Sequence, residues 1–177
     1  MSYTIRRSTL EDIPVMLRLA EAARAIMRAS GNHHQWTSGY PSAEVFTADI
    51  ERGCSYLMCD DDGTAVATFA FIPGPDPTYA EIFDDVLPTG EPLHGAWLDD
   101  EQPYGVVHRI ASLPECHGVM AALLDFCFAQ MPNLRIDTHR DNVIMRHLLT
   151  RYGFTRCGII YLANGDERLA YQKLSHT

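Results

Sequence analysis

The sequence predicts a three-layer α/β domain in which a mixed, mostly antiparallel sheet of about seven strands carries helices on both faces. Segments rich in β-branched and aromatic residues alternate with segments whose apolar residues recur at helical spacing. Near the middle of the chain, a strand, a helix and a second strand follow one another, which requires a crossover between strands. Elsewhere short turns separate neighbouring strands, which favours antiparallel pairing.

The first part of the chain predicts one strand and two helices. Residues 3–7 form the strand, and residues 11–28 form a helix that covers the sheet. The apolar residues of this helix are Ile13, Met16, Leu17, Ala20, Ala23 and Met27. Gly31 ends the helix, and residues 32–41 form an aromatic and polar loop. A short second helix follows, with Ser42 as its expected N-cap.

The next segments predict a hairpin and a long connection. Residues 54–59 and 64–72 are the two strands of the hairpin, because the Asp-Asp-Asp-Gly turn at residues 60–63 separates them. Residues 73–103 contain most of the prolines and a cluster of acidic residues. We expect this connection to run over the surface at one end of the sheet.

The last part of the chain alternates strands and helices. Strands are expected at residues 104–111, 133–138, 154–162 and 168–173, and helices at residues 118–130 and 142–152. In open sheets of this kind, ligands bind where the strand order splits. The turn at residues 115–120 lies beside such a point.

Length and composition predict one domain spanning residues 1–177. The chain has 177 residues, of which 46% are hydrophobic and 21% charged, which suffices for one substantial core. No apolar run approaches the roughly 18 residues of a membrane helix, and the start reads as a strand rather than a signal peptide. These features predict a cytoplasmic protein.

Charge and cysteine content narrow the partners and the chemistry. A formal net charge of −9 disfavours nucleic acid and anionic membranes as partners and favours small cationic ones such as amines. The five cysteines are odd in number and lack Cys-x-x-Cys spacing, which argues against a disulfide framework and a structural zinc site.

The turn at residues 115–120 is a candidate phosphate site. It joins a strand to an amphipathic helix, with Gly118 near its centre. A helix start leaves backbone N–H groups without partners and carries about half a positive charge, which suits a pyrophosphate. The spacing fits a relaxed Q/R-x-x-G-x-G/A loop in which Glu115 takes the first position and Met120 the sixth.

Three segments resemble the GNAT superfamily of acyl-CoA-dependent N-acyltransferases. Residues 5–12, Ile-Arg-Arg-Ser-Thr-Leu-Glu-Asp, are similar to the first strand and helix start of the family. Residues 108–112, His-Arg-Ile-Ala-Ser, followed by the Gly118 turn, resemble the acyl-CoA strand and its pyrophosphate loop. Residues 135–142, Arg-Ile-Asp-Thr-His-Arg-Asp-Asn, continued through Met145, Leu148, Gly153 and Phe154, look like the family's next strand and its N-x-x-A-x-x-L-Y-x-x-x-G-F helix. The third segment is the most specific.

The resemblance implies acetyl-CoA as co-substrate, with no metal. In GNAT proteins the central strand splits from its neighbour, and its free backbone groups hold the pantetheine arm while an N–H polarises the thioester carbonyl. The positions that the resemblance assigns to the cofactor are Ile110, Ala111, Ser112, His117, Gly118, Val119, Met120, Ala121 and Asn142. The amine then attacks directly, so no nucleophilic residue is needed.

Two departures from the family pattern concern the cofactor loop and the acid. Glu115 stands where the family usually has Arg or Gln, so the pyrophosphate loop is atypical, and a carboxylate about 4 Å from a phosphate would cost roughly 1–4 kcal/mol unless it points away. Leu149 occupies the position where the family often has a Tyr that protonates the thiolate. Tyr152, Tyr161 and Tyr104 are alternative acids, as is water.

His108 is the expected general base, because its strand leads into the acyl-binding segment and imidazole titrates near neutral pH. His139, at the end of the following strand, is the second candidate, and water held by Glu81 or another acid of the long connection is the third. Trp36, Tyr40 and Tyr79 are expected to bind the amine substrate, together with Glu81, because aromatic faces attract cations. Core packing is the alternative for each aromatic residue.

The predicted function is therefore an N-acetyltransferase that transfers an acetyl group from acetyl-CoA to a primary amine of a small molecule or to a peptide N-terminus. One alternative is a GNAT-like domain that binds acyl-CoA or another ligand for sensing, without turnover. Another is a metal-dependent hydrolase built on Asp137, His139 and Asp141, although these residues also suit turn and capping chemistry. Homodimers are common in the family, so a homodimer is compatible with this reading.

Overall fold

The computed structural model describes residues 2–175 and contains one seven-stranded mixed sheet. Its strands are β1 (Thr4–Arg7), β2 (Ser55–Cys59), β3 (Ala65–Pro73), β6 (Gly105–Ser112), β7 (Asn133–Thr138), β8 (Thr155–Tyr161) and β9 (Glu167–Leu174). They lie in the order β1-β2-β3-β6-β7-β9-β8. Within the described chain, β6 and β7 pair in parallel, whereas the other neighbours in this sheet pair antiparallel.

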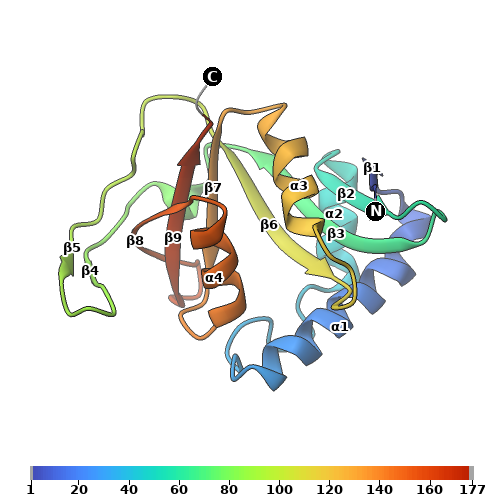
Figure 1. Cartoon of the computed structure of the whole chain (residues 1–177), viewed down its shortest axis with the longest axis horizontal. Coiled ribbons are helices and arrows are strands. Elements are labelled where there is room, and N and C mark those ends of the chain that lie inside the picture. Colours follow the sequence, from blue (N-terminus) through green and yellow to red (C-terminus); the bar gives the residue numbers. More distant parts are fainter. Residues whose placement is uncertain (1, 176–177) are drawn as a thin grey trace.

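Helices cover both faces of the sheet, which confirms the predicted fold class (Figure 1). One face carries α1 (Ile13–Ala29) and α2 (Ala43–Glu51), and the other carries α3 (Val119–Phe128) and α4 (Val143–Arg151). Of the apolar residues expected on α1, Met16, Ala20, Ala23 and Met27 are buried, and Ile13 and Leu17 are partly buried. Leu19, which the spacing did not single out, is buried as well. No helix of the described residues is long and apolar enough to cross a membrane.

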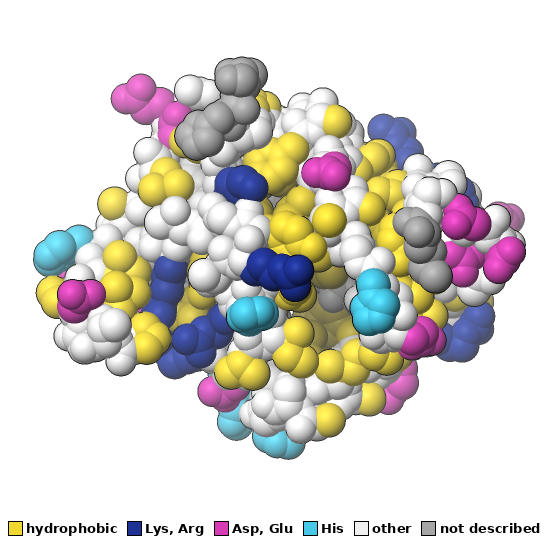
Figure 2. All heavy atoms as spheres, in the orientation of Figure 1, with side chains coloured by type: hydrophobic (Ala, Val, Ile, Leu, Met, Phe, Trp, Pro, Cys, Tyr) yellow, Lys and Arg dark blue, Asp and Glu magenta, His cyan; other side chains and the backbone are white. Residues whose placement is uncertain are grey.

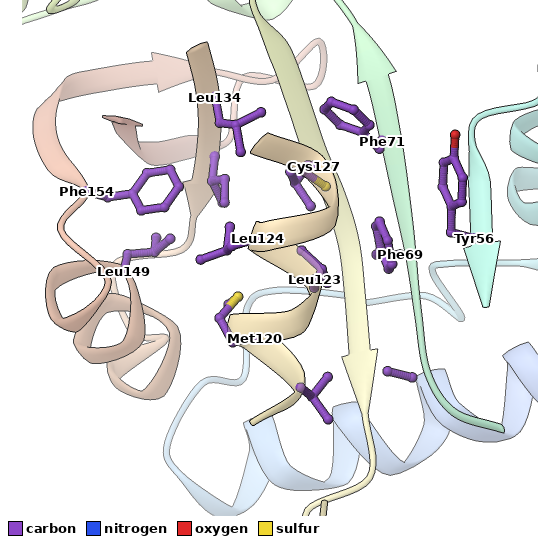
Figure 3. Close-up of a cluster of buried hydrophobic side chains, with 14 of the residues drawn as sticks. Tyr56, Phe69, Phe71, Met120, Leu123, Leu124, Cys127, Leu134, Leu149 and Phe154 are labelled. Carbon is purple, nitrogen blue, oxygen red and sulfur yellow. The ribbon is translucent and has the colours of Figure 1, made fainter. Parts of the chain in front are cut away.

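The larger core lies between the sheet and the pair α3 and α4 (Figure 3). Leu123 of α3 lies on the side of Phe69 of β3, whereas Leu124 of α3 and Leu149 of α4 point toward each other. Leu149 is fully buried. The residue that stands where the family often has a Tyr is therefore part of the core.

Side-chain caps set where α2 and α4 begin. Ser42 Oγ accepts from Val45 N at 3.4 Å at the start of α2, as the sequence predicts. At the start of α4, where the sequence left Asp141 and Asn142 as alternatives, Asn142 Oδ1 accepts from Met145 N at 3.1 Å. Helix α1 begins two residues later than expected, because the 3₁₀ turn η1 (Leu10–Asp12) precedes it.

The long connection after β3 is better packed than a surface excursion. It contains η2 (Pro77–Tyr79) and a small hairpin of β4 (Asp85–Val86) and β5 (Pro92–Leu93), and it passes the edge of the sheet formed by β8 (Figure 1). Strands of two residues leave no alternation in the sequence, so this hairpin was not predicted. Tyr79 is 1% exposed and belongs to a third hydrophobic cluster with Val106, Ile160 and Ala170.

The centre of the sheet splits between β6 and β7. These two strands pair at Gly105 with Leu134 and at Val106 with Arg135, and the register includes no further pair. On its other side, β6 stays paired with β3 as far as Ser112. Beyond Val106, the edge of β6 that faces β7 therefore lacks a partner strand in the described chain.

Candidate active site

A cavity of about 520 Å³ occupies the split between β6 and β7. Its walls come from Val107 to Ile110 on β6, Ile136 to Thr138 on β7, the start of α4, the loop after α1 and the turn between β8 and β9. Asp76 and Thr78 beside η2 line it as well, so six segments far apart in the sequence meet in one place. On the face of α3 and α4, the surface is hollowed between α4 and the turn before α3, where hydrophobic side chains gather with histidine and basic ones at the rim (Figure 2).

A β-bulge in β6 shapes the wall of this cavity. Thr68 of β3 pairs with Ala111 and Ala70 pairs with His108, so β6 carries one residue more than β3 over this stretch. The extra residue lies beside Arg109, whose φ of 54° is in the left-handed region. Arg109 donates from Nε and Nη2 to the carboxylate of Asp49 on α2, at 2.7 Å each.

His108 lies between two carboxylates. Its Nε2 is 3.1 Å from Oδ2 of Asp76, which precedes η2, and its Nδ1 is 3.8 Å from Oδ2 of Asp137 on β7. The hydroxyl of Tyr79 donates to Asp137 Oδ2 at 2.6 Å. Oδ1 of Asp137 has no hydrogen-bond partner among residues 2–175.

The electrostatics keep Asp76 ionised. Its burial raises the pKa, but the hydrogen bonds from His108 and from the hydroxyl and amide of Thr78 outweigh burial and lower the pKa to about 2. Because a carboxylate only accepts, the contact with His108 places the ring proton on Nε2. In the neutral ring, Nδ1 then carries a lone pair that faces the gap beside Asp137.

Tyr79 acts from beneath the site rather than within it. Burial, and then the charge of Asp137, raise the pKa of Tyr79 well above its ordinary value, so the hydroxyl keeps its proton. Tyr79 is not among the residues that line the cavity. Its role in the structure is to orient Asp137.

The loop after α1 closes one side of the cavity. Arg28 fastens it by donating to the carbonyl oxygens of Asn32, Gln35 and Trp36 at 2.7–3.0 Å. Trp36 and Tyr40 both line the cavity, and the Tyr40 hydroxyl accepts from Nη1 of Arg109 at 3.1 Å. Trp36 is 8% exposed, so it both packs and forms a wall.

Comparison with solved structures assigns the fold to a family. The chain is 31% identical to a GNAT-family acetyltransferase from Streptococcus agalactiae, with a TM-score of 0.84 over 99% of this chain and 96% of that one. The chain belongs to the GNAT acetyltransferase family. A GNAT-family acetyltransferase from Listeria monocytogenes shares the fold at 18% identity, with a TM-score of 0.66 over 97% of this chain and 94% of that one. No protein-family model and no curated protein matches the chain.

Of the cofactor positions that the GNAT resemblance implies, some line the cavity and others do not. Ile110 and Asn142 line the cavity. Ala111 is 1% exposed and packs in the hydrophobic cluster under α1, and Ser112 pairs with Ala67 of β3. Ala111 and Ser112 could therefore contact a ligand in the split through their backbone groups.

The turn before α3 lies outside the lining of the cavity. Val119 and Met120 bury their side chains in the larger core, so these two residues could contact a ligand only through their backbone. With His117, Gly118 and Ala121 they would form a site made of backbone N–H groups. Gly118 has a φ of +77°, and no atom lies within 4 Å of the position where a Cβ would stand. An open turn with free N–H groups at a helix start fits the pyrophosphate of an acyl-CoA.

Two predicted catalytic residues lie away from His108. Tyr152 packs against the larger core and does not line the cavity. His139 lines a neighbouring cavity, with its ring centroid 5.8 Å from that of His34. Burial and the charge of Arg168 lower the pKa of His139. Glu81 is exposed on the long connection and lines neither cavity.

The sequence did not single out Asp76, Arg109 or Arg168 as site residues. Asp76 carried one usable signal, because Asp-Pro-Thr at residues 76–78 is typical of a capped turn. The metal alternative finds no support, since no group of three His, Cys, Asp or Glu within residues 2–175 could hold an ion.

Proposed function

We propose that this GNAT-family protein transfers an acetyl group from acetyl-CoA to the primary amine of a small molecule by direct attack. One observation carries the proposal: His108 is held between Asp76 and Asp137 at the point where β6 separates from β7. A polarised base, an acidic amine site and a free strand edge therefore meet in one cavity.

The free edge of β6 suits the pantetheine arm. Because no strand among the described residues pairs with this side of β6 beyond Val106, its amide and carbonyl groups can pair with the two amides of the arm as a further strand would. Acetyl-CoA supplies the acetyl group as an activated thioester. Backbone N–H groups around Ile110 would orient and polarise the thioester carbonyl.

The acceptor amine arrives as an ammonium ion, which the carboxylates favour. Oδ1 of Asp137 is free to accept from it, and the lone pair on Nδ1 of His108 lies on the same side. Asp76 holds the ring and stabilises the imidazolium that forms when Nδ1 takes the proton. His108 is thus the general base, and Asp76 is a positioning residue.

Tyr40 is the proton donor that the cavity favours in place of Tyr152. It lines the cavity, and because Arg109 donates to its oxygen, the hydroxyl hydrogen is left to point elsewhere. Trp36 forms an aromatic wall on the same side. Its face would attract the ammonium before deprotonation.

A thiol-release assay tests the proposed function. Purified protein is given acetyl-CoA and a panel of primary amines, amino acids and short peptides, and free CoA thiol is measured with the acetylated product confirmed by mass spectrometry. We expect acceptor-dependent release that His108→Gln lowers by about 100-fold or more near neutral pH. Acetyl-CoA binding by calorimetry without release on any acceptor would instead favour a sensing domain, and absence of both would contradict the proposal.

A further inference from the structure

Arg168 on β9 is a buried cation that has no anionic partner within residues 2–175. It is 7% exposed, and it lines the cavity that contains His108 and Asp137. Among residues 2–175, its guanidinium donates one hydrogen bond, from Nη1 to the carbonyl oxygen of the adjacent Glu167 at 2.8 Å, and no carboxylate lies within 4.0 Å of it. Burial of an ionised group without a counter-ion is costly, so proteins rarely retain it without a reason.

The nearby acids are engaged elsewhere. Glu167 accepts from Arg140 at 2.7 Å, and Asp166 accepts from the side-chain amide of Asn164 at 2.9 Å. The charge of Arg168 reaches its surroundings instead, because it helps burial to lower the pKa of His139. Arg168 thus adds a positive charge to the cavity, which Asp166 also lines.

Register relates Arg168 to the proposed amine site. Asp137 of β7 pairs with Ala170 of β9, and Arg168 is two residues away from Ala170 along the same strand. Residues two apart project from the same face of a sheet and are about 6.6–6.8 Å apart along the strand. The cavity thus has an acidic end at Asp137 and a basic end at Arg168, separated by the length of a small molecule.

We propose that the acceptor is an amino carboxylate, whose ammonium group binds at Asp137 and His108 while its carboxylate pairs with Arg168. This inference rests on the proposed acetyl transfer and specifies its substrate class. A guanidinium holds a carboxylate through two parallel hydrogen bonds, which would supply the counter-ion that Arg168 lacks. A simple amine would leave that charge unpaired.

Matched acceptors test the proposal. Each amino acid of a panel is compared with its decarboxylated amine and its carboxamide, and the ratio of kcat/KM between acid and amine is measured. We expect the wild type to prefer the acids and Arg168→Met to lower the ratio by roughly 10- to 100-fold, the usual contribution of a charge-assisted pair. Arg168→Lys should restore part of the ratio. Arg151→Met, an exposed arginine at the end of α4, should leave it unchanged.

A binding measurement separates this inference from the proposed function. In thermal unfolding, the preferred amino acids should raise the Tm of the wild type and should not raise that of Arg168→Met. Without ligand, Arg168→Met should unfold at or above the wild-type temperature, because it removes an unpaired buried charge. A large fall in Tm would indicate a structural role and overturn the inference. An active Arg168→Met enzyme with an unchanged ratio of kcat/KM between acid and amine would also overturn it. If the amino acids raise the Tm but no acceptor is acetylated, only the proposed acetyl transfer is contradicted.

Discussion

The proposed role of His108 as a base depends on its neighbours as much as on the residue itself. The imidazole is partly buried, and carboxylates from two other segments face its two nitrogens at 3.1 and 3.8 Å. Asp76 fixes the ring through a hydrogen bond and also accepts from Thr78. Because Asp76 is held on both oxygens, the lone pair of Nδ1 keeps one direction, toward the gap beside Asp137.

Replacing His108 should remove general-base catalysis. We expect His108→Gln to lower kcat by about 100- to 10,000-fold, the usual range for a positioned base, with a smaller change in KM for acetyl-CoA. The rate should regain part of its value at high pH, where the free amine no longer needs a base. A kcat and pH–rate profile equal to those of the wild type would show that His108 is not the base.

The two tyrosines offer a matched pair for the acid. Tyr40 lines the cavity and Tyr152 packs against the core, and both lose only a hydroxyl as phenylalanine. We expect Tyr40→Phe to lower kcat by about 10- to 100-fold and Tyr152→Phe to change it less than about threefold. Steady-state rates at one pH suffice to compare them. The reverse order would return the role to Tyr152.

At the scale of elements, β6 decides the geometry of the site. It remains paired with β3 throughout and leaves β7 after two residue pairs, so one of its edges is free. The bulge at Arg109 makes this strand depart from the register of its neighbour. The ion pair of Arg109 with Asp49 joins the bulge to α2 and also places Tyr40.

Breaking this ion pair should destabilise the fold. Arg109 and Asp49 are 13% and 4% exposed, so Asp49→Ala leaves an unpaired buried guanidinium and should lower the free energy of unfolding by about 3–5 kcal/mol. Glu21→Ala, which breaks a pair whose acid is 74% exposed, should cost less than about 1 kcal/mol. Urea unfolding at neutral pH measures both. Equal costs would show that the bulge does not depend on Asp49.

For the whole molecule, stability should fall in acid partly through Asp76. Its pKa is about 2 when folded against an ordinary value of 3.8, so unfolded chains bind the proton more readily. The resulting contribution, about 2 kcal/mol, is complete above about pH 5 and is lost as the pH falls toward 2.

The variant Asp76→Asn isolates this contribution. We expect it to be less stable than the wild type by about 2 kcal/mol at pH 6, and the difference should shrink toward zero near pH 2. Urea unfolding across this pH range measures it. A difference that does not change with pH would mean that the loss comes from the hydrogen-bond geometry rather than from ionisation. The pKa of Asp12 is also about 2. Its contribution to the acid-dependent loss of stability should be the same in the wild type and in Asp76→Asn.

The sequence by itself determined the elements and the family. Helical spacing in α1, the turn before β3 and the caps at Ser42 and Asn142 are local properties, because each depends on residues a few positions apart. The segments around His108 and Asn142 carried the GNAT resemblance, which the structural match confirms. Helix boundaries differ from the expected ones by one or two residues, since a 3₁₀ turn or a hydrogen-bonded loop can replace a helical turn at little cost.

Only the tertiary structure decided which side chains share the cavity. Asp76, His108, Asp137 and Arg168 come from four segments, and their approach depends on the split of β6 from β7 and on the packing of the long connection. The same packing buries Tyr79, which the sequence offered as a substrate-binding residue, and Leu149, which stands where the family often has a Tyr. Charged side chains so far apart in the sequence come together through the register of the whole sheet, and no local pattern encodes their proximity.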